Sequence, residues 1–110
     1  MHVIKELPDV PAERAIKVIG GRWKIYILFF MFDAPRRFSE LCRLIPAASQ
    51  KVLVEHLHEL EEHGIVRRDA SSWSLTPLGQ SLRPVVDMLC SWGRRHADEH
   101  GDVATESLTT

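Results

Sequence analysis

The chain has 110 residues, of which 45% are hydrophobic and 26% are charged, and its net charge is −1. This length supplies about one compact domain with one core, which leaves no room for a catalytic domain beside a binding domain. Because its net charge is near neutral, the chain lacks the overall excess of basic residues that is typical of a nucleic-acid-binding protein. A surface that binds nucleic acid would need basic residues concentrated in one part of the chain.

Two helices are expected in the first third of the chain. Pro11 suits the first position of a helix, and Gly20-Gly21 suits the end of that helix. Residues 23–32 are apolar almost all round, which predicts a central core helix that ends before Pro35. An apolar run of this length is too short for a membrane span, which takes about 20 residues.

Residues 36–63 have the pattern of a helix-turn-helix, in which a short helix, a tight turn and a second helix follow one another. Ser39 and Ser49 each precede an apolar-periodic stretch, where a hydroxyl can accept a hydrogen bond from a free backbone N–H and start a helix. The second helix is expected to end at Gly64. Its predicted buried stripe is Leu53, Leu57 and Leu60. Its opposite face, the candidate surface for reading DNA, carries Lys51, Val54, Glu55, His58 and Glu62.

A small hairpin is predicted next, from residues 65–68, a polar turn at 69–72 and residues 73–75. Thr76-Pro77 starts another helix, and Pro84 is expected to bend or divide it. The expected fold is therefore mainly α with a small β-hairpin wing: a winged helix-turn-helix with extra N- and C-terminal helices that form a dimer interface.

Basic residues concentrate in residues 21–51, where six of them stand against two acidic residues, a local net charge of +4. A recognition helix presents its N-terminal residues to base edges while flanking groups hold phosphates. The base-contact candidates are Ser49, Gln50, Lys51 and Glu55. The phosphate-contact candidates are Arg36, Arg37, Arg67 and Arg68. An alternative role for Arg67 and Arg68 is to protect an edge strand from aggregation by their charge.

Several separated motifs resemble the HxlR-type transcription regulators over about residues 11–96. They are Ile19-Gly20-Gly21-Arg22-Trp23, Pro35 to Leu41, Ser49 with Lys51-Val52-Leu53, Ser74 to Gly79, and Ser91-Trp92-Gly93. The resemblance implies a homodimeric winged-helix protein that binds operator DNA as a repressor or an activator. Many members carry a sensor Cys just before the Pro that opens the first helix, whereas this chain has Val10, which excludes thiol sensing there. Members commonly have Arg where this chain has His56, and a longer wing.

Dimerisation is also expected from the supply of apolar residues, because the core of one domain cannot cover both sides of the terminal helices. The dimer-interface candidates are Ile16, Leu78, Leu82, Val86, Leu89 and Trp92. Two reading helices would address a palindromic operator with half-sites about 34 to 36 Å apart. As a hypothesis, Phe29 and Phe30 add to this interface or to a pocket for a small apolar effector.

The expected organisation is an N-terminal extension (1–10), a DNA-binding and dimerisation domain (11–100) and a polar tail (101–110). Residues 1–8 lack the pattern of a signal peptide, so a cytoplasmic protein without a membrane segment is expected.

Three other functions are alternatives to this one. A winged helix that binds protein instead of DNA would suit the near-neutral charge. A metal-responsive regulator would use His96 and His100, which stand four apart, but no third ligand is evident, so no metal or other cofactor is expected. Cys42 and Cys90 lie in apolar helical patterns where thiols are usually inert, so no enzyme is expected.

Overall fold

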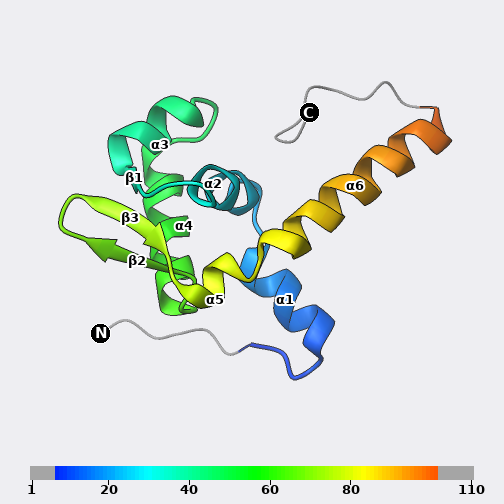
Figure 1. The fold of residues 1–110 in the computed structure, drawn as a ribbon, viewed down its shortest axis with the longest axis horizontal. Helices are drawn as coiled ribbons and strands as arrows, with labels where there is room; N and C mark the ends of the chain where they lie inside the picture. The colour runs from blue at the N-terminus through cyan, green and yellow to red at the C-terminus, as the bar shows by residue number, and fades with distance from the viewer. Residues whose placement is uncertain (1–6, 102–110) are drawn as a thin grey trace.

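The fold is mainly helical with one small sheet, as Figure 1 shows for the computed structural model, which describes residues 7–101. Its elements are α1 (Pro11–Ile19), α2 (Lys24–Met31), β1 (Arg36–Arg37), α3 (Phe38–Leu44), α4 (Gln50–Glu62), β2 (Val66–Asp69), β3 (Ser72–Leu75), α5 (Pro77–Gln80) and α6 (Arg83–His100). The predicted winged helix-turn-helix is confirmed. The predicted extension and tail lie outside the described residues, apart from residues 7–10 and 101.

Most helix ends follow the residues that predicted them. Helix α1 begins at Pro11 and ends before Gly20, and Gly21 then adopts a φ of +112°, a left-handed conformation that favours glycine. The Ser49 Oγ caps α4 by accepting a hydrogen bond from the Val52 N–H at 3.1 Å. Pro84 lies in the first turn of α6, so the segment is divided into α5 and α6.

The start of α3 differs from the prediction. Ser39 does not cap this helix, because α3 already begins at Phe38 with Arg37 at the cap position. The Arg37 N–H donates to Glu40 Oε1 at 2.9 Å. Arg37 also ends a strand that pairs with β3, and this pairing holds its backbone extended, so the helix begins directly after it.

The sheet is antiparallel with the strand order β1-β3-β2. Strands β2 and β3 form the predicted hairpin, with Val66 opposite Leu75 and Asp69 opposite Ser72. Relative to the prediction, β2 is shifted by one residue toward the turn, and β3 begins one residue earlier. Strand β1 was not predicted; it adds Arg36 opposite Trp73 on the other side of β3. The sheet therefore connects the segment ahead of α3 to the wing.

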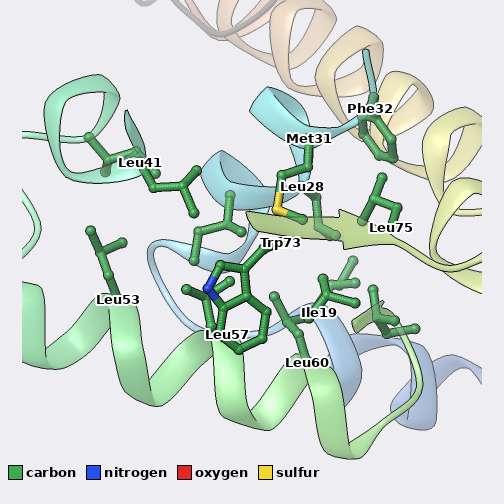
Figure 2. Packing of buried hydrophobic residues seen from close by; sticks show 14 of the residues in the cluster. Ile19, Leu28, Met31, Phe32, Leu41, Leu53, Leu57, Leu60, Trp73 and Leu75 are labelled. Carbon is green, nitrogen blue, oxygen red and sulfur yellow. The ribbon is translucent and has the colours of Figure 1, made fainter. Parts of the chain in front are cut away.

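The core lies between α2, α4 and the sheet (Figure 2). Leu53, Leu57 and Leu60 are fully buried, as their spacing predicted. They pack in one cluster with residues of α2 such as Leu28, and with Trp73 of β3. One face of α4 is thereby committed to the interior, which leaves the opposite face outward.

Helix α5 is anchored to the end of α4 by the Thr76-Pro77-Leu78-Gly79 segment. The Thr76 hydroxyl accepts a hydrogen bond from the Gly79 N–H at 3.0 Å and donates to the Gly64 carbonyl at 2.6 Å. A Cβ at position 79 would lie 2.1 Å from the Ile65 carbonyl oxygen, so only glycine fits. This contact fixes where the chain turns toward α6.

Candidate nucleic-acid interface

The N-terminal half of α4 brings the base-contact candidates together on an exposed surface. Ser49, Gln50, Lys51 and Glu55 are all exposed. The helix is 13 residues long, and the Ser49 side chain caps its first turn. Of the predicted outward face, Lys51, Val54, Glu55 and His58 are exposed, and Glu62 is half-buried. The arrangement offers a hydroxyl, an amide, an ammonium and a carboxylate to a base edge.

The two arginines ahead of α3 have different surroundings. Arg36 turns inward, where its Nε donates to the Phe30 carbonyl at 2.7 Å and Nη1 lies 3.8 Å from Glu40 Oε2. Its side chain is only 27% exposed, so part of its hydrogen-bonding capacity is used within the fold. Arg37 is exposed, and no side-chain interaction of its guanidinium is seen among residues 7–101. Arg37 is therefore the more available of the two for a phosphate.

The wing carries Arg67 and Arg68 in exposed positions. The Arg67 Nε lies 3.4 Å from both Asp69 Oδ2 and Ser74 Oγ, which offsets part of its charge. The Arg68 guanidinium lies over the Trp73 ring, 5.7 Å from its centroid. The turn consists of two residues, and Ala70 has a φ of +49° there. The wing is therefore short, and its positive charge is concentrated at Arg68.

An ion pair that the sequence did not reveal joins α2 to α4. Lys24 is only 2% exposed, and its Nζ lies 3.0 Å from Glu59 Oε2. Lys24 was counted in the basic segment, but a buried ammonium adds little to the surface that a DNA molecule meets. A lysine at the start of an otherwise apolar helix signals the need for an anionic partner. The position of this lysine in the sequence does not indicate which carboxylate is its partner, because Glu59 lies 35 residues away.

His56 belongs to the same buried region. Its Nδ1 lies 3.9 Å from Glu59 Oε1, and its ring lies close to Gly21, where a Cβ would come within 3.3 Å. Burial and the Lys24 ammonium lower the pKa of His56, while the carboxylates of Glu59 and Glu55 act in the opposite direction. The imidazole is thereby held neutral, so it contributes no cationic charge to the reading helix near neutral pH.

Three of the six dimer-interface candidates contribute to an exposed apolar face on α1 and α6, and Leu78 is exposed on α5. Ile16 is 66% exposed and Trp92 is 64% exposed, and Leu78 and Leu89 are exposed as well. Leu82 is half-buried. Val86 is only 1% exposed, so the single chain already buries it in its own core, which leaves it off this exposed face. The face also includes residues that sequence reasoning omitted, namely Val10, Val85 and Met88. Figure 1 shows α6 running out from the rest of the fold.

Phe29 and Phe30, the hypothetical interface or effector-pocket residues, lie side by side in sequence on α2. Both rings are half-buried and meet edge to face at 5.3 Å, and Phe30 packs against the core. A cavity of about 370 Å³ lies elsewhere, between α1 and α4. Its lining residues are Leu7, Ile16, Lys17, Gly20, Gly21, Lys24, Glu59 and His63.

The residues that could take part in metal or thiol chemistry lie outside the outward face of α4, on α3 and α6. No group of three or more His, Cys, Asp or Glu side chains in this range is arranged to hold a metal ion. His96 and His100 stack on each other at 5.2 Å, and Trp92 stacks on His96 at the same distance. Cys42 and Cys90 are half-buried free thiols. None of the described helices has the length and apolar character needed to cross a membrane.

The sequence is similar to known transcription regulators. Residues 18–101 match the model of the HxlR-like helix-turn-helix family. The HTH-type transcriptional regulator YkvN of Bacillus subtilis (strain 168) is 42% identical over 90 residues, which cover 76% of each chain. The HTH-type transcriptional regulator YodB of the same organism is 35% identical over 101 residues, covering 86% of this chain and 89% of YodB.

Solved structures have the same fold. The redox regulator HypR in its reduced form superposes with a TM-score of 0.77 at 36% identity, covering 83% of this chain and 97% of HypR. Quinone-bound YodB from B. subtilis superposes with a TM-score of 0.73 at 36% identity, covering 77% of this chain and 97% of that chain. The residues that match the family model include the helix-turn-helix, the wing and α6.

Proposed function

The chain belongs to the HxlR-like helix-turn-helix family, and the relatives named above are transcriptional regulators. On this premise, we propose that it binds a palindromic operator as a homodimer. The observation that carries the proposal is the outward face of α4. Leu53, Leu57 and Leu60 hold the helix against the core, while Ser49, Gln50, Lys51 and Glu55 stay exposed at its N-terminal half. A helix held in this way can enter a major groove.

We place the bases under α4 and the phosphates beside it. Gln50 can pair with adenine, Lys51 can reach guanine acceptors and Glu55 can accept from cytosine N4, each contributing about 1 to 3 kcal/mol of discrimination. Arg37 and Arg68 are the exposed candidates for phosphate contacts, with Arg67 beside them. Arg36 contributes mainly by fixing the segment ahead of α3, through its bond to the Phe30 carbonyl.

The homodimer is supported by the exposed apolar face of α1 and α6. Ile16, Leu89 and Trp92 are each at least half exposed in the single chain, and water contact of that extent on large apolar side chains is unfavourable. A second copy would cover them across a two-fold axis. The two reading helices would then meet half-sites about one DNA turn, roughly 34 to 36 Å, apart.

A small-molecule effector is part of the proposal. The structure of YodB with a bound quinone supports this class of signal for a relative of this chain. We place the effector near the dimer helices, either in the cavity between α1 and α4 or beside the Phe29–Phe30 pair. To regulate, it must bind one dimer geometry more tightly than another. We also propose that the protein acts in the cytoplasm.

The test is fluorescence anisotropy with DNA from immediately upstream of the protein's own coding sequence and with scrambled DNA, at two salt concentrations. We expect selective binding that weakens steeply with salt, because phosphate contacts release counterions. Lys51→Ala should weaken this binding. Lys17→Ala is the matched control, because Lys17 is exposed on α1 instead of α4. Selective binding that both variants weaken equally would contradict the assignment of α4.

A winged helix that binds protein instead of DNA is the competing outcome. It would give no binding to either DNA at low salt. Equal weak binding to both duplexes would instead call for selection of a cognate site from a random DNA pool, with the same two variants.

A further inference from the structure

We infer that Val54 reads thymine, by packing against the C5-methyl group in the major groove; this inference rests on the proposed function. Among the large hydrophobic residues of α4, Val54 alone is exposed, at 37%. The leucines of the same helix are fully buried. Val54 is also absent from the residues that pack against the core. Its side chain is therefore not part of the hydrophobic core.

The position of Val54 places it among the base-contact candidates. It lies three residues after Lys51 and four after Gln50, so the three side chains share one side of the first two helical turns. His58, four residues further on, is exposed on the same side, and its ring is 6.3 Å from that of Trp73 in the wing. Val54 thus lies between the capped end of α4 and the wing.

The chemistry of the major groove determines what an apolar side chain can recognise there. Base edges present hydrogen-bond donors and acceptors, and the one apolar group with a distinct position is the thymine methyl. A valine can offer nothing to guanine, cytosine or adenine beyond shape. Two methyl-bearing groups brought within about 4 to 4.5 Å exclude water between them. Removing the thymine methyl should then weaken binding about fourfold, the factor that corresponds to one buried methyl group.

The experiment replaces thymine with deoxyuridine, which removes the methyl group and keeps every hydrogen-bonding atom. The probe is the tightest-binding duplex selected by the purified protein from a pool of random DNA. Each thymine in one half-site, with its symmetry mate, is replaced in turn, and the dissociation constant is measured by anisotropy. For the unaltered protein we expect one thymine position at which uracil weakens binding about fourfold.

The variant Val54→Ala should bind the thymine duplex more weakly and lose the difference between thymine and uracil at that position. Val52→Ala is the matched control, because Val52 is a half-buried valine two residues away on another side of the helix, and it should keep the difference. Alanine favours helix more than valine does, so Val54→Ala should not unfold α4. Circular dichroism of each variant checks this.

Two results would overturn the inference. If the protein binds the selected duplex but no thymine is methyl-sensitive, or if Val54→Ala keeps the full difference, Val54 does not read thymine, and the proposed function still stands. If no sequence is enriched and no duplex binds, the inference and the proposed function fail together.

Discussion

Glu59→Ala should destabilise the fold strongly, although Glu59 is partly exposed. The substitution leaves the Lys24 ammonium, which is 2% exposed, without the carboxylate that now lies 3.0 Å away. Removing one partner of a buried pair costs about 3 to 5 kcal/mol. Because the Glu59 side chain is 39% exposed, water screens part of the interaction, and we expect a loss of about 2 to 3 kcal/mol. In a domain of this size, that lowers Tm by about 10 to 20 °C.

The assay is urea unfolding followed by circular dichroism, with Tm from thermal scans. Glu61→Ala is the matched control, because Glu61 is exposed on the same helix, and its effect should stay within about 0.5 kcal/mol. Adding Lys24→Met to Glu59→Ala should restore most of the stability, because an apolar side chain of similar length then fills the buried position without a charge. The reasoning is refuted if Glu59→Ala is as stable as Glu61→Ala, or if Lys24→Met gives no recovery.

Three further predictions concern the histidine beside this pair, the dimer and the helix cap. Burial and the Lys24 ammonium lower the pKa of His56 below its ordinary 6.5, so the unfolded chain takes up a proton that the folded chain resists. The free energy of unfolding should therefore fall as the pH is lowered through 6.5, and His56→Gln should flatten this dependence; an equal slope in both proteins would contradict the assignment. Leu89→Glu with Trp92→Glu should convert a dimer into a monomer in light scattering, while Asp87→Asn on the same helix should not, and an unchanged mass in the double variant would remove this face from the interface. Ser49→Ala should cost about 1 kcal/mol of stability and Ser49→Thr much less, because threonine keeps the capping hydroxyl, so equal losses in urea unfolding would argue against the cap.

The sequence predicted those parts of the fold that depend on neighbours along the chain. Pro11, the Ser49 cap, the leucine stripe of α4 and the break before Pro84 each act within one or two helical turns, so their effect can be read from spacing alone. The exposure of the base-contact candidates follows from the same periodicity, because a buried stripe determines which residues lie opposite.

The features of the structure that the sequence did not predict depend on contacts between segments that are distant along the chain. Strand β1 consists of two residues that pair with β3 residues 37 and 35 positions away, and so short a strand carries no alternating pattern. That pairing also moved the start of α3 from Ser39 to Phe38. Arg36 looked like a surface charge, but the Phe30 carbonyl holds it inward. The partner of Lys24 could not be found either, because several carboxylates on α4 were equally eligible by sequence.

The exposed apolar face of α1 and α6 has a consequence for how sharply such a regulator responds. If the single chain leaves Ile16 and Trp92 in water, and two copies must meet before one operator is filled, then at low protein levels occupancy rises with the square of the concentration of free chains. A twofold change in synthesis would then alter occupancy about fourfold in this range. The hydrophobic surface of one helix pair would thereby act as a threshold in gene expression, before any effector is bound.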